Sequence, residues 1–188
     1  MNELRKFIEK YTPLSDNEWK EISACFTLRT VQKDEVILQE GKTCRHLYFL
    51  ESGLLHFFIN KDGNPITKFF TESPYFLTSQ ASFNSQKPSN ENIQAIEKSI
   101  IWQISYADTN DLYRLKGWTE FARMIIQEVQ FFTEQILEEL QTETAEFRYE
   151  KMLKDEPDFL KRIPLKILAS YLGIAPQSLS RIRKKLTT

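Results

Sequence analysis

Residues 35–58 of the chain read EVILQEGKTCRHLYFLESGLLHFF. Three short runs rich in aliphatic and aromatic residues make up this segment, and two turn signals separate them, Glu40-Gly41 and Glu51-Ser52-Gly53. Short apolar runs punctuated by glycine are typical of β-strands joined by tight turns. Similar runs follow, with no helical period between them, at residues 66–70, 93–96 and 100–104. The sequence therefore predicts an antiparallel barrel or roll rather than alternating β and α units.

Two local motifs place the neighbouring elements. The tetrapeptide Lys61-Asp62-Gly63-Asn64 lies between two strand-like runs and predicts a hairpin, because Asp-Gly favours the positive φ angles of a two-residue turn. Near the N-terminus, Ser15-Asp16-Asn17-Glu18 has the pattern of a capping box, in which the serine caps a helix and the glutamate reaches back to it. A helix is therefore expected from about Asp16 to Phe26.

A long helical pattern follows the strand-like runs. Between Gly117 and Leu140, apolar side chains recur every three or four residues, and the segment contains no proline. A helix of this length spans about 36 Å at 1.5 Å per residue. Its apolar stripe can pack on the roll or pair with the same helix of a second copy, and its length favours both. The expected dimer interface consists of Phe121, Ile125, Val129, Phe132 and Ile136.

The C-terminal residues 161–188 differ in charge from the rest of the chain. They contain seven Lys and Arg residues and no Asp or Glu, whereas the whole chain has a formal net charge of −1. The tail therefore carries +7 and the first 160 residues carry −8. Such an asymmetry indicates that the tail contacts a polyanion.

The charged tail also has an apolar pattern with helical spacing. Pro164 suits a first helical turn, Gly173 suits a helix end, and Pro176 suits the start of a second helix. This order predicts a helix-turn-helix motif, whose second helix enters the major groove of DNA. The alternative is an ordinary helical hairpin with solvated charges. Seven apolar residues give the two helices their buried side: Leu165, Leu168, Ala169, Leu172, Leu179, Ile182 and Leu186.

Composition limits the other functions that the chain can have. Apolar residues make up 41% of the 188 residues, which is enough for a packed core. No apolar run approaches the roughly 18 residues that span a bilayer, and the charged N-terminus has no secretory core, so a cytoplasmic location is expected.

The few cysteines and histidines argue against metal or haem chemistry. They are Cys25, Cys44, His46 and His56. Alone they make no disulfide framework, zinc site or four-cysteine iron–sulfur cluster, and nothing in the sequence supports haem. A roll-type metalloenzyme built on the two histidines would need further acidic or thiol ligands. No catalytic residue, metal or cofactor is therefore expected.

Two segments of the chain resemble one known family. Residues 163–186, IPLKILASYLGIAPQSLSRIRKKL, are similar to the C-terminal motif of the cyclic-AMP receptor protein and fumarate-nitrate regulator (CRP/FNR) family of bacterial transcription factors, and residues 35–58 resemble its sensor roll. The resemblance implies an α+β fold with three parts. A cyclic nucleotide-binding-like β-roll at residues 1–107 precedes a linking and dimerisation helix at residues 108–140, and a helix-turn-helix domain occupies residues 141–188.

The resemblance also implies partners and contacts. Family members act as homodimers on double-stranded DNA, with RNA polymerase as a further partner. By match to their recognition helix, the base-contacting residues would be Gln177, Ser178 and Arg181. Arginine can pair with guanine and glutamine with adenine. Positive side chains further along the helix suit phosphates, and these are Arg183, Lys184 and Lys185.

The nucleotide site departs from the family pattern. Members carry a Gly-Glu pair and a later Arg-Ser or Arg-Thr pair, whereas an ungapped match places Thr78-Ser79 and Ser89-Asn90 there. Both charged side chains are absent, so cyclic AMP is not expected as the effector, although Lys87 is a cation nearby. The four matched residues either line a pocket for a neutral ligand or belong to a plain surface loop.

The sequence thus predicts a homodimeric, sequence-specific DNA-binding transcription regulator that is not an enzyme. One alternative stays open, namely a ligand-binding module that acts through protein contacts without specific DNA recognition. Retention on DNA with a steep salt dependence would separate the two.

Overall fold

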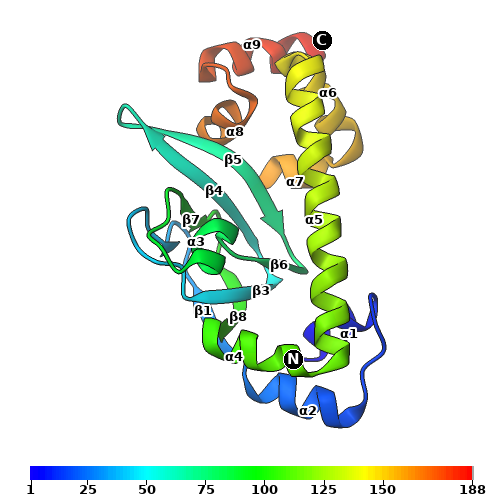
Figure 1. The fold of residues 1–188 in the computed structure, drawn as a ribbon. Coiled ribbons are helices and arrows are strands. Elements are labelled where there is room, and N and C mark those ends of the chain that lie inside the picture. Colours follow the sequence, from blue (N-terminus) through cyan, green and yellow to red (C-terminus); the bar gives the residue numbers. More distant parts are fainter. Residues whose placement is uncertain (188) are drawn as a thin grey trace.

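The computed structural model describes residues 1–187, and Figure 1 shows a β-roll with helices at both ends. Within these residues, eight strands form two four-stranded sheets, and all their pairings are antiparallel. The sheets have the orders β1-β8-β3-β6 and β2-β7-β4-β5. The strands are β1 (Thr27–Val31), β2 (Val36–Leu38), β3 (His46–Ser52), β4 (Leu54–Lys61), β5 (Asn64–Glu72), β6 (Tyr75–Leu77), β7 (Asn92–Ala95) and β8 (Ser99–Ser105).

The helices precede, interrupt and follow the roll. In Figure 1, α5 runs along the whole molecule, from α1 and α2 near the N-terminus to α6 and α9 near the C-terminus. The helices are α1 (Asn2–Glu9), α2 (Asp16–Ala24), α3 (Gln80–Ser85), α4 (Tyr106–Asp111), the 3-10 turn η1 (Leu112–Arg114), α5 (Lys116–Thr142), α6 (Ala145–Asp155), α7 (Pro157–Arg162), α8 (Leu165–Leu172) and α9 (Pro176–Thr187).

The hairpin predicted between β4 and β5 is confirmed. Asp62 and Gly63 have φ angles of 52° and 77°, and Lys61 pairs with Asn64, so the connection is a two-residue turn. Because turn type and loop length fix the register of a hairpin, this turn determines which side chains of β4 face inward. Gly53 joins β3 to β4 with a φ angle of 114°, which residues with a side chain rarely adopt.

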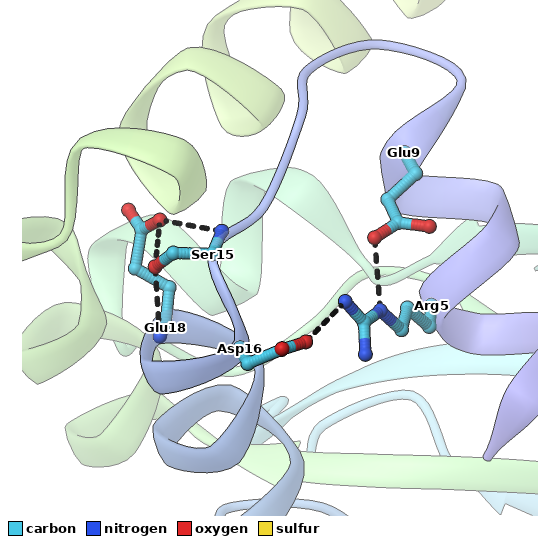
Figure 2. A network of polar contacts seen from close by, with 5 residues as sticks. All are labelled: Arg5, Glu9, Ser15, Asp16 and Glu18. Carbon is cyan, nitrogen blue, oxygen red and sulfur yellow. Dashed lines mark hydrogen bonds and ion pairs between the residues drawn. The ribbon is translucent and has the colours of Figure 1, made fainter.

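The capping box predicted at Ser15 is also confirmed, and α2 ends at Ala24. Ser15 Oγ accepts the Glu18 N–H at 3.2 Å, and the Glu18 carboxylate accepts the Ser15 N–H at 3.1 Å, as Figure 2 shows. The second carboxylate oxygen of Glu18 accepts the N–H of Gly117 at 2.9 Å. This bond satisfies a backbone donor in the first turn of α5, so α2 holds the start of the long helix. In the same view, Arg5 joins α1 to α2 through an ion pair with Asp16.

Three clusters of buried side chains hold these elements together. One fills the roll between the two sheets and includes Phe57. A second packs α1 and α2 against the start of α5, with Trp118 1% exposed. The third joins the roll to the C-terminal helices, because Leu54 of β4 and Leu168 of α8 belong to it. The position of the C-terminal helices is therefore set by apolar packing on the roll.

The long helix is confirmed, but residues 108–140 do not form one continuous helix. Helix α4 and the 3-10 turn occupy residues 106–114, and α5 runs from Lys116 to Thr142. Leu115 between them is extended, with φ −87° and ψ 127°. This residue changes the direction of the chain and gives α5 a separate start.

Several short elements are not predicted by the sequence patterns, namely α1, β1, α3, β6 and α7. Strand β1 lies at the edge of its sheet and leaves Leu28 57% exposed, so it lacks the alternation of a half-buried strand. Strand β6 has three residues, too few for a period. Pro164 is extended and caps α8 instead of lying in its first turn.

Candidate nucleic-acid interface and sensor site

Helices α8 and α9 meet at a turn that begins with Gly173. This residue has φ 74° and ψ 25°, and the N–H of Ile174 donates to the carbonyl of Ala169 at 3.0 Å, as is typical where glycine ends a helix. Leu172 and Leu179, one from each helix, are 2% and 0% exposed. This shared core holds α9 in a fixed orientation on α8.

The outer face of α9 is polar and begins with two of the predicted base-contacting residues. Gln177 and Arg181 are exposed one turn apart, and Ser178 between them is half-buried. Within residues 1–187, the side chain of Arg181 makes no hydrogen bond or ion pair. The guanidinium of Arg181 is therefore available to an external partner.

The predicted phosphate-contacting residues lie in the second half of α9. Arg183, Lys184 and Lys185 are exposed, and the first two also have contacts within the chain. Lys185 forms an ion pair with Glu146 of α6 at 2.6 Å, and this hydrogen-bonded partner raises the pKa of Lys185. Because the Lys185 side chain is 72% exposed, such a pair contributes little to stability and is easily exchanged.

The C-terminal helices cover the open edge of β5. This strand is the last in its sheet, so the N–H and C=O groups on its outer side need other partners. The Ser170 hydroxyl of α8 accepts the N–H of Thr67 at 2.9 Å and donates to the carbonyl of Pro65 at 2.9 Å. One side chain therefore satisfies both backbone groups and joins α8 to the sheet.

Aromatic and ionic contacts extend this junction. The ring centroids of Phe70 in β5 and Tyr171 in α8 are 5.0 Å apart. Arg162 of α7 pairs with Glu97 at 2.6 Å and with Glu72 at the end of β5. The junction thus contacts both β5 and the turn between β7 and β8.

The long helix α5 divides into a covered half and an exposed half. Phe121 is 1% exposed in the core of its own chain, and Ile125 packs beside it. Of the other predicted interface residues, Val129 and Phe132 are 40% and 52% exposed, and Ile136 is half-buried. Exposed apolar side chains outside the predicted set are Ile126, Phe131, Leu137 and Leu140. Within the described residues, no helix is both long and apolar enough to cross a membrane.

The four predicted pocket residues are only partly brought together. Ser79 and Ser89 are 1% and 5% exposed, and their hydroxyl oxygens are 3.2 Å apart. Thr78 donates instead to the carbonyl of His46 at 3.0 Å, and Asn90 is exposed. Of the four predicted residues, only the two serines therefore meet at a buried point.

Two charged residues that the sequence analysis did not select complete this site. Glu91 is 6% exposed, and its carboxylate accepts from Ser79 Oγ at 2.6 Å and pairs with Lys68 Nζ at 2.5 Å. A signal for both is present in the sequence. Glu91 is the single acidic residue of the polar segment 78–92, and Lys68 interrupts the apolar run 66–70.

The two histidines lie in different surroundings. His56 is buried, with Nε2 3.1 Å from Gln94 Oε1 and its ring stacked on Phe58 at 5.0 Å. His46 is half-buried, with its ring 5.9 Å from that of Tyr48. Burial lowers the pKa of both imidazoles. In residues 1–187, no three His, Cys, Asp or Glu side chains gather in a way that could hold a metal ion.

Comparison with known proteins identifies the roll and the overall fold. Residues 28–115 match the family model of the cyclic nucleotide-binding domain, and no curated protein matches the chain in sequence. A transcriptional regulator of the CRP/FNR family from Eubacterium rectale has a TM-score of 0.75 at 18% identity, over 95% of this chain and 88% of the regulator.

Two other solved structures share the fold. FixK2 from Bradyrhizobium japonicum has a TM-score of 0.70 at 16% identity, over 86% of this chain and 84% of its own. The catabolite activator protein of Thermus thermophilus has a TM-score of 0.58 at 18% identity, over 94% of this chain and 85% of its own. These matches confirm the resemblance to the CRP/FNR family, and at such identities the likeness is one of fold.

Proposed function

We propose that this chain, which contains a cyclic nucleotide-binding domain and has the fold of CRP/FNR regulators, is a homodimeric, sequence-specific DNA-binding transcription regulator. One observation carries the proposal. Helix α9 is fixed on α8 by a glycine turn and a shared core, and it leaves Gln177 and Arg181 exposed on the outer face of a strongly basic segment. A chain with this role acts in the cytoplasm and has no catalytic site.

The chemistry of α9 suits the major groove. An exposed arginine and an exposed glutamine one turn apart can form paired hydrogen bonds with guanine and adenine edges. The positive charges in the second half of the helix suit phosphates, which position a protein without reading sequence. We therefore assign base contacts to Gln177, Ser178 and Arg181, and phosphate contacts to Arg183, Lys184 and Lys185.

The exposed half of α5 supports the proposed dimer. A row of apolar residues that stays in water in a single chain is typical of a surface that pairs with another protein. Pairing through Val129, Phe132 and Ile136 would place two copies of α9 on one side of the dimer. Two recognition helices of this kind contact half-sites about 34 Å apart, or one turn of DNA.

Replacing Arg181 by Ala is expected to weaken binding to the preferred site by about 1–3 kcal/mol and to relax specificity at one base pair in each half-site. Lys184→Ala is the matched control, because losing a phosphate contact should weaken all sequences alike and flatten the salt dependence. The measurement is selection of bound sites from random DNA, followed by titration of both variants on the selected site and on random DNA.

Equal losses on selected and random DNA for Arg181→Ala would remove the base-contacting assignment. If the wild-type protein is not retained on DNA at any salt concentration, the chain is instead a module that acts through protein contacts.

The roll is proposed to sense something other than a cyclic nucleotide. Where the family has an arginine for the cyclic phosphate, the buried centre of this site has Ser79 and Ser89 hydroxyls beside the Glu91 carboxylate. A phosphate placed there would meet the buried Glu91 carboxylate, and the cation at the site, Lys68, is already paired with that carboxylate. Calorimetry with cyclic AMP and cyclic GMP should therefore detect no binding at micromolar concentrations. A micromolar dissociation constant for either nucleotide, lost in Lys87→Ala, would contradict this expectation.

A further inference from the structure

The centre of the sensor site is a fixed, buried carboxylate. Glu91 Oε1 accepts from Ser79 Oγ at 2.6 Å, and Ser79 itself is 1% exposed. The Ser89 hydroxyl accepts the N–H of Glu91 at 3.1 Å and donates to its carbonyl at 2.9 Å. The backbone and the side chain of Glu91 are therefore both held by neighbouring hydroxyls, which cannot neutralise the charge.

The cation that balances this carboxylate is much more exposed to solvent, although it also lies 5.5 Å from the ring centroid of Phe69. Lys68 Nζ lies 2.5 Å from Glu91 Oε2, and its side chain is 42% exposed, whereas that of Glu91 is 7% exposed. Lys68 is also the extra residue of a β-bulge, because Phe57 pairs with Phe69 and Phe58 pairs with Thr67. A flexible side chain thus reaches from solvent into a rigid site.

The charge of the site restricts what can replace Lys68. A buried carboxylate that loses its cation is strongly destabilising, so departure of the ammonium is favoured when another positive group takes its place. A neutral or anionic ligand would leave Glu91 unpaired. A ligand with a primary ammonium group would keep both the charge balance and the hydrogen bond to Oε2.

We propose that Glu91, with Ser79 and Ser89, forms a binding site for a small organic amine, and that Lys68 occupies this site when the amine is absent. The proposal rests on the sensor role given to the roll above and names the chemical class of its effector.

The position of Lys68 connects this site to the C-terminal helices. Thr67, the preceding residue, donates its N–H to Ser170 of α8 at 2.9 Å. Because a bulge is not fixed by ladder hydrogen bonds, release of Lys68 can shift Thr67 and alter its bond to α8. Occupancy of the amine site would therefore change how α8 and α9 are held on the roll.

The test uses n-butylammonium chloride as the probe, because it has the four-carbon stem and the ammonium group of lysine. Lys68→Ala in the full chain should lower the Tm, and millimolar probe should restore at least half of the loss. Sodium chloride and tetramethylammonium chloride at equal ionic strength should not, since neither donates a hydrogen bond. The double variant Lys68→Ala, Glu91→Gln should show no specific restoration.

A second measurement uses the wild-type protein and does not depend on the folding of a variant. Brief labelling with acetic anhydride should modify Lys68 severalfold faster when the probe is present. Lys61, which is exposed at the end of β4, corrects for reagent consumed by the amine. The probe must exceed the millimolar effective concentration that a tethered group has at its own site.

The proposal is overturned if the probe protects Lys68→Ala no better than sodium chloride, or protects the double variant equally well. If Lys68→Ala does not fold, an unchanged ratio of Lys68 to Lys61 labelling in the wild type overturns it. DNA retention is scored separately on the same preparations. If the protein binds the amine but not DNA, the proposed regulator function is therefore wrong, whereas the proposed amine site is supported.

Discussion

Replacing Val129 and Phe132 together by Glu is expected to convert the proposed dimer into monomers. Both side chains are exposed in a single chain, at 40% and 52%, so the substitutions should leave the fold of the monomer intact. In a helix pair, the new carboxylates would be buried against the partner without cations. The cost is on the order of 3–5 kcal/mol, or about two to four powers of ten in the dimer dissociation constant. Sedimentation velocity at micromolar concentration measures the outcome.

DNA binding should fall with the dimer, because a monomer presents one copy of α9 and contacts one half-site. The matched control is Phe131→Glu, a neighbouring residue that is 63% exposed on a different side of α5. This variant should remain a dimer and bind DNA as the wild type does. If the double variant sediments as a dimer, the subunits associate through another surface. If Phe131→Glu sediments as a monomer, the interface instead extends around α5.

The choice of these two residues depends on information that the sequence pattern lacks. The period of three and four predicts one stripe from Trp118 to Leu140, and α5 follows it. The pattern does not say where the stripe passes from its own core to solvent. That boundary is set by α1 and β6, two elements too short to be predicted from a pattern. They pack Phe7 and Phe76 against Phe121, with ring centroids 6.4 Å and 5.0 Å away. Phe121 is therefore committed to the monomer, whereas Phe132 is not.

The sensor site, likewise, is predicted only in part by the sequence. The match to a known cassette selects Ser79 and Ser89, and the structure places their hydroxyls together. The match does not select Lys68 and Glu91, because 23 residues separate them in the sequence and the bulge at Lys68 changes the strand register. An alternating pattern predicts which side chains share a face only where strand pairing is regular. A bulge adds one residue and shifts the side chains that follow it to the other face. The tail was more predictable, because prolines, glycine and apolar spacing fix α8 and α9 locally.

Gly53→Ala is expected to destabilise the roll by about 2–5 kcal/mol, the sum of left-handed strain and forced overlap. At this residue φ is 114°, and a Cβ would lie 2.1 Å from Ser99 Oγ and 2.9 Å from Ser99 Cα. The Cα of Ser99 is a backbone atom and cannot rotate away from the new Cβ, as the end of a flexible side chain could. The β3–β4 turn or the turn before β8 must therefore move. Urea unfolding followed by far-UV circular dichroism measures the change.

Gly41→Ala is the matched control, because φ is 82° and no atom lies within 4 Å of the new Cβ. The positive φ angle alone should then lower the free energy of unfolding by about 1–2 kcal/mol. The difference between the two variants isolates the close approach to Ser99. If both variants lose the same free energy of unfolding, the β3–β4 turn can move away from Ser99 without cost.

The Gly53 substitution should also loosen the C-terminal helices, because the same turn carries their docking surface. The carbonyl of Leu54 accepts the N–H of Ile96 at 2.9 Å, and both side chains belong to the cluster that contains Leu168 of α8. Displacing this turn separates Leu54 and Ile96 from α8. Amide exchange at Thr67, whose N–H is held by Ser170, should therefore accelerate in Gly53→Ala and not in Gly41→Ala. Unchanged exchange in Gly53→Ala would mean that Ser170 holds α8 on β5 without help from the apolar cluster.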